Sequence, residues 1–431
     1  MSATVIQADY TWIENGFAAD VQVAVGGDGR IEAVGDLGRE VTHSLHHAAL
    51  LPGFVNAHSH AFQRGLRGQA ERFPGAAGSF WTWRESMYQL AASLDGATFH
   101  RLSLRAFHEM RDAGITAVGE FHYLHHEHEG DHRFDDLLLE AAREAEIRLV
   151  LLQTFYATGG IGKSLEGAQR RFATPSLDRY WNQLDRLAAL VDPGTQTLGV
   201  AAHSIRAVGL DQIGGLHQEA VRRDLPFHMH VEEQRAEIAE SVAAYGQAPM
   251  PLLQEKLETR RNFCAVHCTH TAVDAMRRFL QSGGAICLCP LTEANLGDGL
   301  PDLQGLAGAR LSLGTDSNAR ISMLEEMRLL EYGQRLRGER RGALADPSGR
   351  VATTALVAAT EGGAQALKLP AGRIAPGYWG DLVVLDLTSP SLAELAPEVL
   401  LEGLIFGGGN EAISGTFVGG RWRASGTAAG R

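Results

Sequence analysis

The sequence predicts an α/β fold, a (β/α)8 TIM barrel accompanied by a small β-sandwich domain built from both chain termini. Two observations predict the barrel: eight apolar runs of strand length recur along the middle of the chain, and helix-like segments separate them. A third observation predicts the sandwich, because both flanks show alternating stretches with glycine turns. Each central run also ends in polar residues, which is where such barrels carry their catalytic groups.

The expected barrel strands are the eight central runs. In order they are LLPGFVNAHSH, GITAVGEFHY, IRLVLLQTFY, TLGVAAHSIR, LPFHMHVEE, FCAVHCTH, GAICLCPLTEAN and RLSLGTDSN. Between them, segments such as ATFHRLSLRAFHEMRDAG and DLLLEAAREAE repeat apolar residues at spacings of three and four, which predicts helices. We therefore expect the polar strand ends to converge at one mouth of the barrel.

The domain boundaries follow the change of pattern along the chain. We expect residues 1–50 and 373–431 to form the two parts of the sandwich, with strands in VQVAVGGDGRIEAVG, GDLVVLDL and AISGTFVGGRWRAS. Residues 51–372 form the expected barrel. Residues 61–90 are rich in aromatic side chains and too long for a plain connection, so we expect a long loop before the next helix. Such loops are often lids or binding loops.

Composition and charge limit the partners of the protein. The 431 residues carry a formal charge of −12 without a long run of like charge, which argues against nucleic acid as a partner. The N-terminus lacks a secretory signal pattern, and no apolar run approaches the length of a membrane helix, so we expect a cytoplasmic enzyme without a membrane partner. The four cysteines are expected to be buried rather than zinc-binding, because their spacing is not that of paired C-x2-C motifs.

Histidines at the strand ends predict a metal site. His58 and His60 are two residues apart, so both side chains leave a strand on the same side. Taken alone, this pair fits ordinary polar residues as well as a metal. Later runs add His230, Glu233, His267 and Asp316 at their own ends. Histidine nitrogens and a carboxylate form a set suited to zinc or a similar divalent ion, with room for a water.

The stretches PGFVNAHSH, HMHVEE, VHCTH and LGTDSN resemble the signature strands of the amidohydrolase superfamily, and the similarity covers essentially the whole chain. The resemblance implies the metal ligands His58, His60, His230 and Asp316, with Glu233 as a proton shuttle and His267 as the group that polarises the bound water or the developing oxyanion. The fourth run ends in Ala-Ala-His203, without the modified lysine of two-metal members. A single ion is therefore favoured, zinc first and iron(II) as the alternative.

The residue types indicate hydrolytic deamination. A divalent metal lowers the pKa of bound water toward about 7, so a metal-bound hydroxide is the expected nucleophile. Asp316 is placed to accept the proton of that water, which makes it a catalytic residue as well as a ligand. Glu233 is expected to deliver protons to the nitrogen that leaves as ammonia.

Two arginines predict a substrate with carboxylates. Arg84 lies in FWTWRE and Arg206 in HSIR, and the guanidinium group binds carboxylates bidentately. Each arginine taken alone also fits a structural ion pair. The combination of NAHSHAFQRGLRG, FWTWRE, EFHYLHH and HSIRAV resembles the formimidoylglutamate deiminase family, which acts on a linear amidine with two carboxylates in histidine degradation. That resemblance implies a homodimer and the substrate-binding residues Gln63, Arg84, Tyr123, His203 and Arg206.

Other interpretations stay open at the level of sequence. The same fold and metal would serve a deaminase of guanine or S-adenosylhomocysteine type, or an imidazolonepropionase, and an inactive barrel could serve as an assembly module. The run His122-Tyr-Leu-His125-His126-Glu-His128, followed by His132, could indicate a second metal site. We favour a solvated loop, because the spacing fits no single face. His228 shares a strand face with His230 and is expected to support the site one layer deeper.

Overall fold

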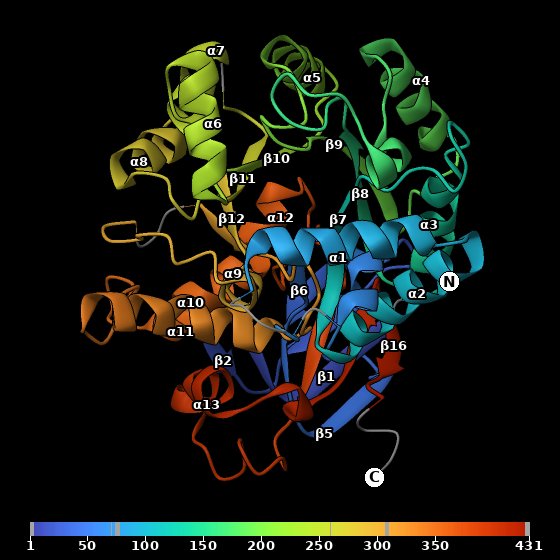
Figure 1. The fold of residues 1–431 in the computed structure, drawn as a ribbon. Helices are drawn as coiled ribbons and strands as arrows, with labels where there is room; N and C mark the ends of the chain where they lie inside the picture. The colour runs from blue at the N-terminus through green and yellow to red at the C-terminus, as the bar shows by residue number, and fades with distance from the viewer. Residues whose placement is uncertain (1–3, 70, 74–77, 259, 307–309, 427–431) are drawn as a thin grey trace.

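The computed structural model describes residues 4–69, 71–73, 78–258, 260–306 and 310–426 (Figure 1). Its centre is a sheet of eight parallel strands in chain order. They are β6 (Phe54–Ser59), β7 (Ile115–His122), β8 (Arg148–Phe155), β9 (Gln196–Ala202), β10 (Phe227–Val231), β11 (Phe263–His267), β12 (Ala285–Leu288) and β13 (Leu311–Leu313). All eight predicted strands are thereby confirmed. Their residues are almost all buried, as expected for strands with side chains inside the barrel and under helices.

Backbone pairing between the first and last strands closes the barrel. Ser59 forms a parallel bridge with Asp316. The Asp316 N–H donates to the His58 carbonyl at 3.0 Å, and the His60 N–H donates to the Asp316 carbonyl at 2.9 Å. A Cβ on Gly314 would lie 2.7 Å from the carbonyl oxygen of His58, so only glycine permits this approach. Closure therefore brings the ends of β6 and β13 together.

Helices surround the barrel, and α1 (Phe80–Ser93) crosses in front of its mouth (Figure 1). They are α1 (Phe80–Ser93), α2 (Gly96–Asp112), α3 (Arg133–Glu144), α4 (Leu177–Ala188), α5 (Leu210–Arg222), α6 (Arg235–Tyr245), α7 (Pro249–Lys256), α8 (Val273–Gln281), α9 (Pro290–Leu296), α10 (Met323–Gly338), α11 (Val351–Val357), α12 (Gly363–Ala366) and α13 (Leu400–Gly407). Asp95 caps α2 by accepting from the Thr98 N–H at 2.8 Å. Among the described residues, no helix is long and apolar enough to cross a membrane.

The expected long loop over residues 61–90 was wrong in its second half. Helix α1 begins at Phe80, after a 3-10 turn over Ala61–Leu66, and residues 70 and 74–77 lie outside the described residues. The Ser79 N–H donates to the Thr82 hydroxyl at 3.0 Å and so caps the helix. Aromatic residues are weak helix formers, so helix propensity alone does not predict α1. Phe80, Met87 and Ala91 lie at helical spacing on its buried face. Packing of this face therefore stabilises the helix.

The two chain flanks build a second, mixed sheet, as the sequence predicts. Its strands are β1 (Thr4–Ile13), β2 (Gly16–Ala18), β3 (Gln22–Val25), β4 (Ile31–Gly35), β5 (His43–Pro52), β14 (Leu382–Asp386), β15 (Ile413–Val418) and β16 (Arg421–Ala424). The order β16-β15-β14-β5-β1-β3-β4 pairs N-terminal β5 with C-terminal β14, and β2 pairs with β1. Helix α13 interrupts the C-terminal flank, which the alternation pattern missed. The boundaries at residues 50 and 372 stay predictions.

A buried ion pair joins the mixed sheet to the barrel. Arg148 opens β8 and donates from Nε and Nη2 to the two carboxylate oxygens of Asp381, at 2.8 and 3.0 Å. Both side chains also hydrogen-bond to the backbone. Asp381 accepts from the Gly419 N–H at 2.8 Å, and Arg148 donates to the Gly194 carbonyl at 2.8 Å. The guanidinium lies 3.9 Å from the centre of the Trp379 ring. Removing one partner would leave a buried charge unpaired.

We expect Asp381→Ala to lower the free energy of unfolding by about 3–5 kcal/mol, because Arg148 keeps its charge in a buried site without its partner. Chemical denaturation followed by circular dichroism measures this loss. Asp274→Ala is the matched control, because its ion pair with Arg277 is exposed, and it should leave the transition almost unchanged. An Asp381→Ala protein as stable as the control would show that the pair does not hold the two sheets together.

Candidate active site

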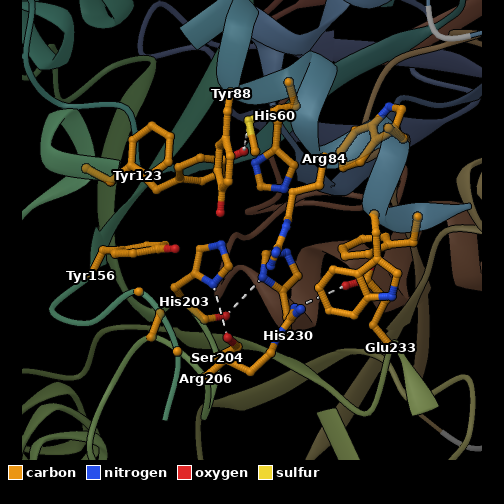
Figure 2. A pocket seen from close by; sticks show the side chains of 18 of the residues that line it. His60, Arg84, Tyr88, Tyr123, Tyr156, His203, Ser204, Arg206, His230 and Glu233 are labelled. Carbon is orange, nitrogen blue, oxygen red and sulfur yellow. Dashed lines mark hydrogen bonds and ion pairs between the residues drawn. The ribbon is translucent and has the colours of Figure 1, made fainter. Parts of the chain in front are cut away.

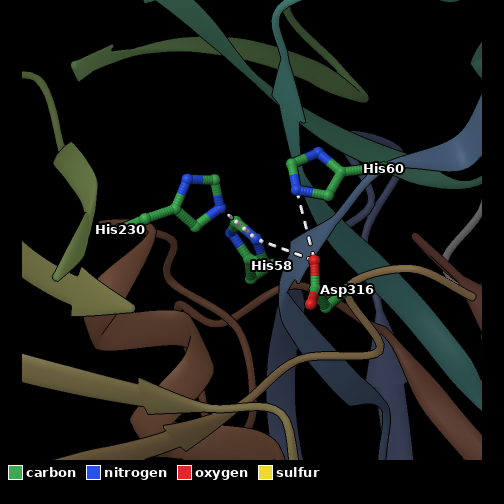
Figure 3. Close-up of side chains that lie close together, drawn as sticks. All are labelled: His58, His60, His230 and Asp316. Atoms are coloured by element: carbon green, nitrogen blue, oxygen red, sulfur yellow. Dashed lines mark hydrogen bonds and ion pairs between the residues drawn. The ribbon is translucent and has the colours of Figure 1, made fainter. Parts of the chain in front are cut away.

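Four side chains gather where the strands end at the mouth of the barrel (Figure 3). His58 and His60 leave β6 on the same side, His230 comes from β10 and Asp316 follows β13. One nitrogen or oxygen atom of each lies within 4.8 Å of the others, and all four residues are buried. The Nε2 atom of His58 lies 3.1 Å from Nε2 of His230 and 3.3 Å from Oδ1 of Asp316. The Nε2 atom of His60 lies 3.2 Å from the same oxygen.

The hydrogen bonds behind the rings determine which nitrogens face the cluster. His60 donates from Nδ1 to the Phe121 carbonyl at 2.8 Å, and His230 donates from Nδ1 to the His203 carbonyl at 2.9 Å. Carbonyl oxygens only accept, so the Nε2 atoms of both rings point their lone pairs at the cluster. Burial lowers the pKa of His58 to about 3 and that of His230 well below its usual value. Ring nitrogens directed inward beside a carboxylate fit a shared divalent cation.

Two ionisable groups stand beside this cluster. The Nε2 atom of His267 lies 3.8 Å from Oε1 of Glu233 and 3.9 Å from Oδ2 of Asp316. Burial by itself would lower the pKa of His267, but Glu233, Glu293 and Asp316 outweigh it and raise the pKa to about 10. Burial raises the pKa of Glu233. The arrangement provides a cationic ring and a carboxyl group that can carry a proton, both next to the cluster.

The five predicted substrate-binding residues line one cavity beside the cluster. Figure 2 labels four of them, Arg84, Tyr123, His203 and Arg206. Gln63 donates from Nε2 to the Tyr123 hydroxyl at 2.7 Å, and its own Oε1 has no hydrogen-bond partner among the described residues. The Arg84 guanidinium lies 4.3 Å from the centre of the Trp81 ring. Arg206 lies 3.6 Å from Glu233. Two cations and several polar groups therefore face the same space as the cluster.

Several residues of this region escaped the sequence analysis. Tyr88 and Tyr156 line the cavity, and buried Glu293 in α9 lies 3.4 Å from the other ring nitrogen of His267. Tyr156 directly follows the third barrel strand, which is the same position that identified Tyr123 after the second. Glu293 lies in the seventh run, just beyond its strand. A search of the residues just beyond each predicted strand would have found Tyr156 and Glu293. Tyr88 lies in a helix that the sequence did not predict.

The expectation of a solvated histidine loop after β7 was wrong for its first three histidines, whereas His128 is exposed as expected. His122, His125 and His126 are buried. Asp135, on α3, accepts from Nε2 of His122 and Nδ1 of His125, both at 2.9 Å, and from Nε2 of Gln183 at 2.7 Å. These hydrogen bonds and charges hold the pKa of Asp135 well below its usual value, although burial alone would raise it. The sequence pattern missed this network because Asp135 lies outside the histidine run.

Two other expectations concern His228 and the four cysteines. His228 is buried and donates from Nε2 to the Ala366 carbonyl at 2.9 Å, so it packs beneath the cluster rather than joining it. The four cysteines are free and buried, as the sequence predicts.

Known proteins share both the sequence and the fold. The chain is 39% identical over 427 residues to a formimidoylglutamate deiminase from Pseudomonas aeruginosa, and the match covers 97% of this chain and 94% of that protein. A crystal structure of an amidohydrolase from Brucella melitensis superposes with a TM-score of 0.88 at 32% identity and covers 98% and 95% of the two chains. An adenosine deaminase from Xanthomonas campestris with bound zinc gives a TM-score of 0.82 at 26% identity, covering 98% and 93%.

The family match spans most of the chain. The Amidohydrolase family matches residues 49–423, which contain the whole barrel and its strand-end cluster. The cluster also offers the nitrogen and oxygen donors that a divalent metal requires. The chain therefore belongs to the amidohydrolase family and is a hydrolase that acts on a carbon–nitrogen bond.

Proposed function

We propose that the protein hydrolyses N-formimino-L-glutamate to N-formyl-L-glutamate and ammonia, as a step of histidine degradation. The observation that carries this proposal is the presence of Arg84 and Arg206 in the same cavity as the histidine and aspartate cluster. A linear amidine with two carboxylates matches two cations beside a hydrolytic centre. The relative named formimidoylglutamate deiminase supports the same substrate.

We propose that His58, His60, His230 and Asp316 hold one divalent ion, zinc first and iron(II) as the alternative. The lone pairs of His60 and His230 are directed by the hydrogen bonds of their other nitrogens, which favours three imidazole ligands and one carboxylate. The adenosine deaminase with bound zinc supports the choice of metal. A divalent ion in this position would act as a Lewis acid and lower the pKa of a water molecule.

In this proposal, Asp316, His267 and Glu233 each serve a different step of the hydrolysis. Asp316 is placed to take the first proton from the attacking water. The cationic His267 ring, 3.9 Å from Asp316, stabilises the negative charge that develops when the amidine carbon becomes tetrahedral. Glu233 carries protons to the leaving nitrogen, and burial raises the pKa of its carboxyl group. One water adds its oxygen to the carbon, its two hydrogens pass to the nitrogen, and the carbon–nitrogen bond breaks to release ammonia.

The polar wall of the cavity selects the substrate in this proposal. Arg84 and Arg206 bind the two carboxylates, while Gln63, Tyr123 and His203 fix the orientation of the glutamate portion. The free Oε1 of Gln63 offers an acceptor for a substrate N–H group. The Nη2 atom of Arg206 lies 3.6 Å from Oε2 of Glu233. A substrate carboxylate at Arg206 would compete with that contact and leave Glu233 available for proton transfer.

One alternative has a specific observation behind it. The structural similarity to an adenosine deaminase keeps an amino-heterocycle as a second candidate substrate. An imidazolonepropionase would open a ring without releasing ammonia, and an inactive barrel would have lost part of the cluster, which is complete here. We also keep the cytoplasmic location and the homodimer as predictions.

We expect ammonia release from N-formimino-L-glutamate and none from its analogue that lacks one carboxylate, measured side by side on metal-quantified protein. Removal of the metal by a chelator should abolish the activity, and added zinc should restore it. Adenosine and guanine are the comparison substrates. Ammonia from a purine but not from N-formimino-L-glutamate would contradict the proposed substrate.

Glu233→Gln should lower kcat by about 100-fold or more while metal content and KM stay near the wild-type values, because only the proton transfer is removed. Steady-state kinetics and metal analysis measure the two effects. Glu255→Gln is the matched control, because Glu255 on α7 pairs with Gln247 at the surface. A Glu233→Gln enzyme with normal kcat would exclude Glu233 as the proton shuttle.

The two arginines should respond differently to replacement by methionine. Arg84→Met should raise KM by about 10- to 100-fold with little change in kcat, because it removes only a charged hydrogen bond to substrate. Arg206→Met should lower kcat as well, since Arg206 also contacts Glu233. Arg340→Met, at the exposed surface, is the control. Unchanged kcat/KM in either variant would remove that arginine from substrate binding.

A further inference from the structure

We propose that Tyr88 and Tyr156 form a hydrogen-bond donor pair, oriented by Gln169, which binds a substrate carboxylate beside Arg206. This inference rests on the proposed function and names residues that set its specificity. Both tyrosines line the cavity, and they come from different elements, Tyr88 from α1 and Tyr156 from the end of β8. In Figure 2 both approach the space that His203 and Arg206 share.

Gln169 links the two hydroxyl groups from behind the cavity. It is buried, and its Nε2 lies 3.1 Å from the Tyr88 oxygen, 3.3 Å from the Tyr156 oxygen and 3.5 Å from the Gly159 carbonyl. Its Oε1 accepts the backbone N–H of Glu166 at 3.0 Å. A backbone N–H only donates, so the orientation of the amide is determined by its surroundings. Gln169 therefore presents an NH2 donor, and not a carbonyl, to the two tyrosines.

The amide determines the direction of the tyrosine hydrogens. Both hydroxyl oxygens accept from Gln169, so neither hydroxyl hydrogen points back at the amide. Tyr88 lies close enough to Tyr156 to raise its pKa, so at most one of the two hydroxyl hydrogens can be used between them. The second hydrogen has no acceptor in this group and is left to face the cavity. A group that arrives there is met by a donor, which suits a carboxylate oxygen.

The surroundings make this a site for an anion. The Arg84 guanidinium lies 5.6 Å from the centre of the Tyr88 ring. The Tyr156 ring centre lies 4.7 Å from that of His203, one of the predicted substrate-binding residues. Burial raises the pKa of Tyr156 despite the nearby charge of Arg206, so the hydroxyl keeps its proton. Two arginines and a protonated hydroxyl pair therefore surround the same space, and a purine would leave that donor unpaired.

The test measures the binding of glutarate, a dicarboxylate without the amidine, by isothermal titration calorimetry on the metal-loaded protein. We expect Tyr88→Phe to weaken glutarate binding by about 10-fold, the loss of one hydrogen bond to a charged group. Gln169→Glu should weaken it further, because a carboxylate would turn the hydroxyl hydrogens away from the cavity. Gln169→Met removes the amide donor without turning the hydroxyl hydrogens away from the cavity. It should therefore weaken glutarate binding less than Gln169→Glu does. Tyr332→Phe, whose ring stacks on Phe406 outside the cavity, is the control.

A separate readout distinguishes positioning from folding. Each variant should keep the wild-type thermal midpoint within the error of the Tyr332→Phe control, and with N-formimino-L-glutamate the change should appear in KM more than in kcat. Unchanged glutarate affinity in both Tyr88→Phe and Tyr156→Phe would overturn the inference, as would the absence of glutarate binding by the wild type. Glutarate binding that depends on these residues, without ammonia release from N-formimino-L-glutamate, would support the inference and reject the proposed function.

Discussion

The pairing of β6 with the segment after β13 is the interaction on which the rest of the structure depends. Two backbone hydrogen bonds join Asp316 to His58 and His60 and close the barrel. The same bonds place a carboxylate against two imidazoles, at positions far apart in the chain. Close approach requires Gly314, where a side chain would collide with His58. The approach of Asp316 to the two histidines is thus a consequence of barrel closure, whereas the common orientation of His58 and His60 follows from their spacing on one strand.

Charged side chains of the cavity lie close to groups of opposite charge, and Glu233 neighbours both His267 and Arg206. His267 is flanked by Glu233, Glu293 and Asp316, and their negative charges outweigh the cost of burying its cation. The guanidinium of Arg206 lies 3.6 Å from the carboxylate of Glu233. Under the proposed function, a substrate carboxylate would replace Glu233 as the partner of Arg206. Under the same proposal, a ligand without a carboxylate would separate this pair without offering a new one.

Helix α1 and the buried histidines after β7 differ from the sequence prediction for the same physical reason. Helix α1 carries aromatic side chains whose intrinsic preference for the helix is weak, and contacts with the barrel stabilise it. The histidines after β7 fit no regular spacing because they surround Asp135, a residue of the following helix. In both cases the stabilising partner lies outside the segment that the pattern covers. Period and propensity describe one segment at a time and therefore miss such partners.

The sequence by itself determined the eight strands, their order and the chemical types at their ends, because hydrophobic period and strand-end position are local properties. It also led to the family, through the short motifs around His58, His230 and Asp316. Tertiary structure decided which atoms meet: the Nε2 atoms that face the cluster, the ring of acids around His267, and the amide of Gln169 behind two tyrosines. Those contacts depend on backbone carbonyls and side chains brought together from distant segments by closure of the barrel, and no spacing along the chain encodes them.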